Sequence, residues 1–355
     1  MFKRIILIFL LQITTLYAQN NKIIPYCLNN KIGFVDEFFN VLKEPSFASL
    51  EQWNNNNFIL YSLNKQNKVL FNKYGSKNVQ DVILLDNGYY SSYQGYDTLI
   101  YNEAGNCIRT LHNLQHDHNS SYNYIIVFDG EKENIITVNN LYIFDDKNIL
   151  ELYNYDPKTE TALCRYKSKG YCLVKKNAIK NKEKFLFGIR SFNEGAVFGK
   201  NIETGETGFY NMDCKLIIKA EILKDTNIDD WNYFPSISDD VLSFVHEDNS
   251  YIFLSKQQVY HSSNWIITDK NGNIISKSIT ADYIYPFSDN VAVYKLKIND
   301  NFKYGLINKK GEIITTTLYD EINSSVNGYC MAKKNNVDYL ISSNDGTVYL
   351  CNSFK

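Results

Sequence analysis

Short runs that alternate apolar and polar residues, separated by Gly, Asn and Asp, dominate this chain. In "FKYGLINKKGEIITTTLYDEI" (302–322), an apolar run leads to Asn308, a turn with Gly311, and a β-branched run. Period-2 alternation predicts strands, and an Asn or Asp followed by Gly predicts the turn between them. No long segment keeps apolar residues at helical spacing over four turns, so we predict an all-β protein.

This strand–turn–strand block recurs in the C-terminal half of the chain. "WIITDKNGNIIS" (265–276) aligns with "YGLINKKGEIIT" (304–315), which places Gly272 opposite Gly311. In "TGFYNMDCKLII" (207–218) the turn lacks its Gly. Another copy is "YLISSNDGTVYL" (339–350), and a second block with a polar turn before a strand recurs at 192–200, 237–245 and 287–295.

Joined, the two blocks resemble the bacterial WG-repeat (tryptophan–glycine) family. The resemblance covers residues 190–350, and Tyr304 stands where the family prefers Trp, so the resemblance is to a degenerate member. WG-repeat proteins are usually interpreted as interaction modules, so the resemblance implies a binding role. The residues that carry it are Phe287, Ala292, Tyr304, Gly305, Leu306, Ile307, Asn308, Gly311, Ile313, Ile314, Tyr319 and Asp320.

All copies together predict about seven or eight short antiparallel units within a single β-repeat domain, residues 19–355. One unit cannot bury a core, so the units must stack. We predict a β-propeller-like ring, with an open β-solenoid of hairpins as the alternative. An N-terminal strand can complete the last blade of a propeller. We therefore expect residues 21–28 to pair with, or lie beside, the strands of 338–351.

The N-terminus has the features of a signal peptide, residues 1–18. Lys3 and Arg4 precede a short apolar run, and small-residue cleavage is expected after Ala18. No other apolar run is long enough to span a membrane, so we predict no membrane span in the mature chain. The expected location is periplasmic or extracellular.

Composition restricts the classes of partner that we expect and the use of the cysteines. The net charge of −2 provides no basic surface for nucleic acid, so we predict no nucleic-acid partner. The seven cysteines are odd in number and irregularly spaced, which is not typical of a disulfide scaffold. Cys164 and Cys172 flank a turn and should face each other across a hairpin, either as apolar neighbours or as a disulfide.

Two segments were considered as metal sites. His112, His116 and His118 lie close in sequence, but no single backbone conformation brings all three together, so we predict a polar loop and not a metal site. "DTNIDDW" (225–231) begins like a calcium loop, but Asp230 stands where Gly is needed and Ser236 where Glu is needed. We therefore predict no metal ligands in either segment.

No Gly-x-Ser-x-Gly elbow or Gly-rich phosphate loop is present, so we predict no catalytic residues and no cofactor. The predicted function is an exported, non-catalytic binding protein of the bacterial cell envelope, whose partner is an envelope protein or glycan. Recognition is expected in loops between units, among them 112–121 and 225–236. The alternative is an envelope glycan hydrolase with two carboxylates near the channel of a propeller.

Overall fold

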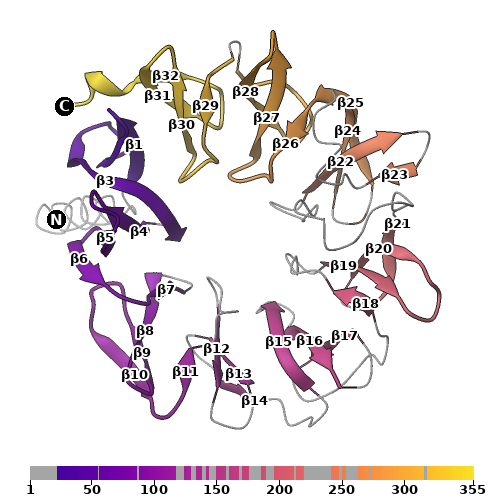
Figure 1. The fold of residues 1–355 in the computed structure, drawn as a ribbon. Helices are drawn as coiled ribbons and strands as arrows, with labels where there is room; N and C mark the ends of the chain where they lie inside the picture. Colours follow the sequence, from indigo (N-terminus) through magenta and orange to yellow (C-terminus); the bar gives the residue numbers. More distant parts are fainter. Residues whose placement is uncertain are drawn as a thin grey trace, which may run out of the picture.

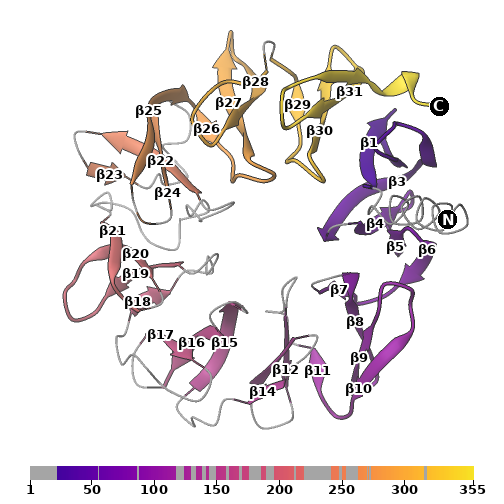
Figure 2. The ribbon, with the colours of Figure 1, turned by 180° about the vertical axis from the view of Figure 1, so that it is seen from behind.

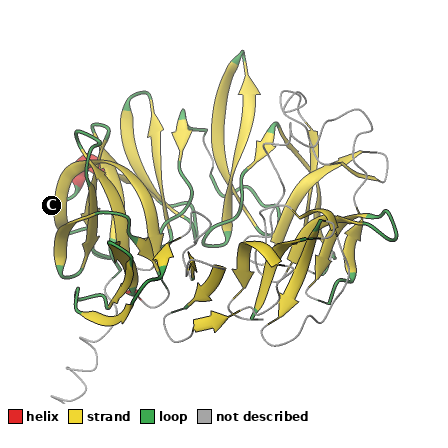
Figure 3. Cartoon of the chain, turned by 60° about the horizontal axis from the view of Figure 1, so that its bottom comes forward, coloured by secondary structure: helices red, strands yellow, loops and turns green. Residues whose placement is uncertain are grey.

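The computed structural model describes part of the chain, and every structural statement below refers to that part. The described residues are 22–54, 56–85, 88–116, 124–128, 133–137, 141–143, 149–156, 160–167, 170–175, 185–188, 196–211, 213–219, 241–247, 250–252, 263–269, 271, 273–315 and 318–355. They contain no α-helix, and a short 3-10 helix, η3 (Cys351–Ser353), lies near the C-terminus (Figure 3). Within these ranges no helix is long and apolar enough to cross a membrane.

The described strands form seven antiparallel sheets that follow one another around a ring (Figures 1 and 2). Sheet 1 contains β1 (Ile24–Leu28), β2 (Lys31–Val35), β3 (Val41–Asn54), β4 (Asn57–Ser62), β5 (Lys68–Asn72) and β6 (Gly75–Val79). Sheet 2 contains β7 (Ile83–Leu84), β8 (Tyr90–Gln94), β9 (Asp97–Tyr101) and β10 (Cys107–Leu111). Sheet 3 contains β11 (Gln115–His116), β12 (Ile125–Phe128), β13 (Glu133–Ile136) and β14 (Leu141–Ile143).

The remaining sheets complete the ring. Sheet 4 contains β15 (Ile149–Asp156), β16 (Thr161–Tyr166), β17 (Tyr171–Lys175), β18 (Phe185–Gly188), β19 (Ala196–Asn201), β20 (Thr207–Asn211) and β21 (Leu216–Lys219). Sheet 5 contains β22 (Val241–Glu247), β23 (Ser250–Ile252), β24 (Ser263–Asp269) and β25 (Ile274–Ala281). Sheet 6 contains β26 (Tyr283–Ile284), β27 (Val291–Ile298) and β28 (Asn301–Asn308). Sheet 7 contains β29 (Glu321–Ile322), β30 (Tyr329–Lys334), β31 (Val337–Ser342) and β32 (Val348–Leu350).

This arrangement is a β-propeller. The predicted all-β ring is confirmed, and the open solenoid is wrong because the first sheet lies beside the last (Figure 1). Sheet 4 consists of two halves that are joined by one residue pair, in which Tyr171 of β17 lies opposite Phe185 of β18. Leu163 of the first half packs with Val197 of the second half in one cluster. Sheet 4 therefore holds two successive units, which is consistent with the predicted seven or eight.

The core lies between neighbouring sheets, so the inner strands are buried on both faces. In β27, Val293 belongs to a cluster shared with sheet 7, whereas Tyr294 belongs to a cluster shared with sheet 5. Successive residues of a strand point to opposite faces. Each of these short strands therefore carries apolar residues at consecutive positions wherever a sheet is covered on both sides.

The turns of the repeat are built by side-chain capping of the backbone. Asn308 accepts hydrogen bonds through Oδ1 from the backbone N–H of Lys310 (2.9 Å) and of Glu312 (3.0 Å). Gly311 has φ of 81°, and Cys214 holds the corresponding position of its own turn with φ of 58°. The predicted Asx turn is confirmed, and it forms without Gly at 214. The same pair of bonds recurs at Asp36, Asn211 and Asp269.

The second strand predicted within 304–315 is wrong. After the turn, residue 313 makes only an isolated bridge, from Ile313 to Ile307. The hydroxyl oxygen of Thr315 then accepts a hydrogen bond from the backbone N–H of Leu306 at 3.0 Å. A side chain thus occupies a donor that a strand partner would otherwise take, and regular pairing with β28 is interrupted until Tyr319 pairs with Tyr304.

Cys164 and Cys172 are directly opposite each other in the β16–β17 ladder, as predicted. Their Sγ atoms lie 3.8 Å apart, well beyond the length of a disulfide bond. Both side chains are buried in a cluster between sheets 3 and 4, where they pack near Ile126 and Leu152. Of the two alternatives, this structure contains the apolar neighbours.

The ring closes where β1 packs against sheet 7. Ile24 and Tyr26 share one buried cluster with Met331 and Leu340. The ring of Phe354 meets Tyr26 edge-on at 5.2 Å. The prediction that residues 21–28 lie beside 338–351 is therefore confirmed for the described residues.

Side-chain hydrogen bonds, and not a shared ladder, join β1 to sheet 7. Its strand partner is β2, to which it is joined by a two-residue turn with positive φ at Asn29 and Asn30. Such a local hairpin closes at far smaller entropic cost than pairing with a strand 300 residues away. The bonds run from Asn29 N to Asp338 Oδ2 (2.9 Å), from Lys333 Nζ to Asn30 Oδ1 (2.7 Å) and from Asn327 Nδ2 to the Ile23 carbonyl (2.7 Å).

Candidate binding site

A cavity of about 630 Å³ lies where sheet 1 meets sheets 6 and 7. Sheet 1 contributes β1 and the long strand β3, whose pairing is interrupted by register shifts on both sides. Such irregularities bend a strand, and they curve β3 around this space. Sheet 7 contributes β29, β30 and the turn after β29, and sheet 6 contributes β27 and β28. The cavity therefore forms only because the ring closes.

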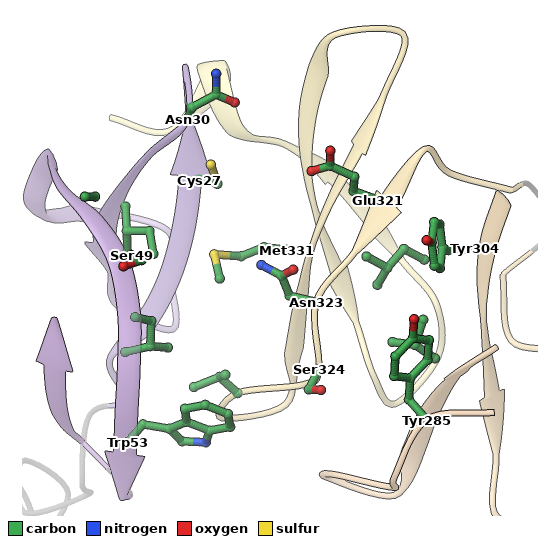
Figure 4. A pocket seen from close by; sticks show the side chains of 16 residues that line it. Cys27, Asn30, Ser49, Trp53, Tyr285, Tyr304, Glu321, Asn323, Ser324 and Met331 are labelled. Atoms are coloured by element: carbon green, nitrogen blue, oxygen red, sulfur yellow. The ribbon is translucent and has the colours of Figure 1, made fainter. Parts of the chain in front are cut away.

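Three aromatic side chains stand around the cavity, one from each of three segments. Trp53 comes from the end of β3, Tyr285 follows β26, and Tyr304 is on β28 (Figure 4). All three are partly exposed. Reciprocal backbone hydrogen bonds with Tyr319, both 2.9 Å, hold the backbone of Tyr304. The cavity thus has aromatic walls that a ligand can reach and that are held on strands.

Several polar side chains line the cavity along its length. Figure 4 shows Asn30 and Glu321 at one end and Ser324 beside Trp53 at the other, with Asn323 between them. Glu321, Asn323 and Ser324 are exposed. Among the described residues that line the cavity, Glu321 carries the one carboxylate. This combination of apolar walls and a few polar groups is typical of binding sites.

Cys27 also faces the cavity, but it is not an activated nucleophile. Burial raises the pKa of its thiol, and the nearby carboxylate of Asp338 adds to the effect. A reactive cysteine needs the opposite shift, because the thiolate is the nucleophilic form.

The carboxylate of Asp320, next to Glu321, is bound by residues outside the cavity lining. Its carboxylate binds Lys303, which lowers its pKa, and it accepts a hydrogen bond from the backbone N–H of Asn335 at 2.7 Å.

The sequence-predicted candidates do not meet at this cavity. Nδ1 of His112 lies 2.9 Å from Asp97, whose carboxylate also accepts the backbone N–H of Asn113 at 3.0 Å. These bonds lower the pKa of Asp97, with the Asn113 bond the larger cause. His116 is part of β11, and His118 lies outside the described residues. Within the described ranges, no group of three possible metal ligands occurs.

The predicted recognition loops fall mainly outside the described part of the chain. Residues 117–121 of the first loop and all of 225–236, including the rejected calcium loop and Ser236, lie outside the described residues. Their role in recognition therefore stays a prediction.

Comparison with protein families identifies one segment. Residues 304–337 match the WG containing repeat. This segment is similar to a WG repeat, and we refer to residues 304–337 below as the WG repeat. This match confirms the predicted resemblance over one part of residues 190–350. The WG repeat runs from β28 in sheet 6 to the start of β31 in sheet 7, so it joins two neighbouring sheets.

One solved structure supports the fold. The chain is similar to a crystal structure of a eukaryotic initiation factor, with a TM-score of 0.52, 9% identity, and coverage of 93% of this chain and 96% of that chain. It is also similar to the WD40 domain of Neurospora crassa Pan2, with a TM-score of 0.31, 9% identity, and coverage of 86% and 91%. At such identities, the likeness to the initiation factor shows the fold alone. No curated protein matches the sequence.

The WG repeat supplies much of the cavity. Tyr304, Glu321, Asn323, Ser324 and Met331 all lie within the matched residues. Of these, the sequence pattern singled out only Tyr304, as a repeat residue. Trp53 and Tyr285 carried no sequence signal, because their role depends on which sheets meet. The ring and its WG repeat form a repeat-based interaction scaffold.

Proposed function

We propose that this chain is an exported, non-catalytic binding protein of the bacterial cell envelope, and that a segment of a partner protein enters the cavity between sheets 1, 6 and 7. The observation that carries the proposal is the aromatic wall of that cavity, formed by Trp53, Tyr285 and Tyr304. Aromatic residues offer large contact area at small conformational cost, which is why they dominate binding surfaces.

The mixture of groups favours a peptide segment in this cavity. Ile322, Val326 and Met331 provide apolar contacts, and Asn323 and Ser324 can bond a peptide backbone. Because the cavity is held by strands of three sheets, its walls are ordered before the partner arrives. Such preorganisation lowers the entropic cost of association.

Turnover is not part of this proposal. Glycoside hydrolysis commonly needs two carboxyl groups about 5–10 Å apart. The described lining of the cavity contains a single carboxyl group, that of Glu321. The thiol of Cys27, which also lines the cavity, has a raised pKa. The arrangement therefore favours recognition over acid–base chemistry.

Site-specific photo-crosslinking tests the proposal. A photoreactive aromatic amino acid at Ser324, which is exposed and lines the cavity, should crosslink one envelope protein in intact cells. The same amino acid at Leu63, on an exposed hairpin tip, is the matched control and should not capture that protein. Ser324→Trp should then fill the cavity and weaken binding of the purified partner about tenfold or more, with an unchanged melting temperature.

Equal crosslinking from Ser324 and Leu63, or undiminished partner affinity in Ser324→Trp, would refute the cavity as the binding site. If the purified protein hydrolysed peptidoglycan or oligosaccharide, and Glu321→Gln abolished that activity, the binding role would be replaced by catalysis.

A further inference from the structure

A second cavity, of about 500 Å³, lies between the last strand of sheet 1 and the first strands of sheet 2. The two sheets meet there in a cluster that contains Leu70 of β5 and Tyr90 of β8, with Val79 of β6 packed against it. This second cavity is separate from the cavity between sheets 1, 6 and 7, which we call the closure cavity, and shares no lining residue with it. We call it the sheet 1–2 groove.

The groove contains an aromatic surface of fixed orientation. The rings of Tyr90 and Tyr101 are stacked, with centroids 5.1 Å apart and planes 10° from parallel. Tyr90 is only 2% exposed, so its ring is anchored in the core, whereas Tyr101 is partly exposed and lines the groove. Tyr101 therefore presents to the groove a ring that packs against the buried ring of Tyr90.

Hydrogen-bonding side chains surround this ring. Asn78 and Gln80 come from the β6 side, and Ser92 and Gln94 come from β8. Asn78, Gln80 and Gln94 are exposed. Amide side chains both donate and accept hydrogen bonds, as do the hydroxyl groups of a sugar. An aromatic face beside several amides thus suits a ligand that is rich in hydroxyl groups and has an apolar ring face.

The charged side chain that lines the groove, Lys77, is positive. Lys77 is exposed, and its Nζ lies 5.8 Å from the centroid of the Tyr101 ring. The lining of the groove contains no carboxylate, and Lys77 forms no ion pair within the described part of the chain. The closure cavity has the opposite character, with Glu321 as its charged group. The sheet 1–2 groove therefore favours a ligand with a negative charge near Tyr101.

We propose that the sheet 1–2 groove binds an acidic oligosaccharide. One sugar ring stacks on Tyr101 in place of the Lys77 ammonium, its hydroxyl groups bond with Asn78 and Gln94, and its carboxylate pairs with the displaced Lys77. This proposal is independent of the peptide-binding role of the closure cavity, because the two sites share no residue. An acidic peptide would satisfy Lys77 and bond with the amides, but its backbone has no apolar ring face to stack on Tyr101.

The test uses the full chain and an array of immobilised short uronate oligosaccharides with their neutral counterparts. Wild type should be retained on uronate spots and only weakly on neutral ones. For a retained uronate, Lys77→Gln should weaken binding about two- to fivefold in a titration, because an ion pair at an exposed site contributes less than a buried one. Lys310→Gln, at an exposed lysine of a distant turn, is the matched control and should bind like wild type.

Gln94→Ala provides a second arm that leaves the charge intact. It should weaken binding of both acidic and neutral sugars to a similar degree, whereas Lys77→Gln should affect only the acidic one. Melting curves of all variants should coincide with that of wild type. No retention of any uronate, equal retention of neutral sugars by wild type, or wild-type affinity in Lys77→Gln would overturn the proposal.

Discussion

At the scale of single residues, the glycine that follows the aromatic residue of the WG repeat has a steric role. Gly305 pairs with Tyr294 across β27 and β28, and the Tyr294 ring lies directly over it. A Cβ on Gly305 would come within 2.5 Å of that ring. The same pairing recurs at Gly33, opposite Tyr26. A tyrosine that covers a strand glycine replaces the packing that the glycine lacks.

Gly305→Ala should therefore lower the free energy of unfolding by about 1–3 kcal/mol, the usual cost of overpacking a buried site. Chemical denaturation monitored by tyrosine and tryptophan fluorescence measures this change. A double-mutant cycle is the control. In a Tyr294→Val background the clash is absent, so the same Gly305→Ala change should cost far less. Identical costs in the two backgrounds would contradict the steric explanation.

At the scale of elements, the ring is held together by β1, which belongs to sheet 1 by its ladder and to sheet 7 by its packing. Ile24 is fully buried and Tyr26 is 2% exposed. Burial raises the pKa of Tyr26 to about 12, so the side chain stays neutral even well above physiological pH. A side-chain hydrogen bond also joins sheets 6 and 7. Asp289, just before β27 of sheet 6, accepts it from the backbone N–H of Gly328 at 2.8 Å.

Deletion of residues 19–28 should lower the melting temperature markedly or cause aggregation. The loss of Ile24 and Tyr26 removes about 1.5–3 kcal/mol of burial for each side chain and exposes Met331 and Leu340. This sum is a large part of the marginal stability of about 5–15 kcal/mol that proteins have. Deletion of residues 19–21 alone leaves β1 intact and should leave the melting curve unchanged. A stable chain without β1 would show that the ring does not depend on this closure.

At the scale of the whole molecule, the propeller places two chemically different cavities at two junctions between sheets. The closure cavity has aromatic walls and a carboxylate, whereas the sheet 1–2 groove has amides and a lysine. A ring of sheets provides such junctions repeatedly, and each takes its chemistry from the few side chains that happen to flank it. One scaffold thus carries two chemically different candidate sites.

Export is the remaining prediction at this scale. The mature protein should begin at Gln19, because Lys3, Arg4, the apolar run and the small residue Ala18 form a cleavable leader. Intact-mass measurement of protein from the periplasm or culture medium tests this expectation. Ala18→Arg should block processing and shift the mass to that of the unprocessed chain. A wild-type product that retains Met1 on the membrane fraction would show that the segment is an anchor.

Much of the fold could be predicted from the sequence, because its signals are local. The turn at Asn308 follows from bonds between neighbouring residues, and the register of Cys164 opposite Cys172 follows from the length of one hairpin. The missing second strand after Gly311 could not be predicted. Its absence depends on a side-chain bond of Thr315 that competes with strand pairing. His112 was weighed as a metal ligand only for its chemistry, and the structure places its Nδ1 2.9 Å from Asp97, a neighbour that the local sequence does not reveal.

The sequence by itself determined the strands, their turns and the repeat that joins them, since period-2 alternation and Asx turns act over a few residues. Only the tertiary structure decided which sheets meet. Trp53 and Tyr304 are far apart in sequence and line one cavity because the curvature of every intervening sheet brings the ends of the chain together. Ring closure depends on the combined curvature of all the sheets, and no local sequence pattern specifies that combination. The candidate sites at its junctions were therefore visible only in the folded molecule.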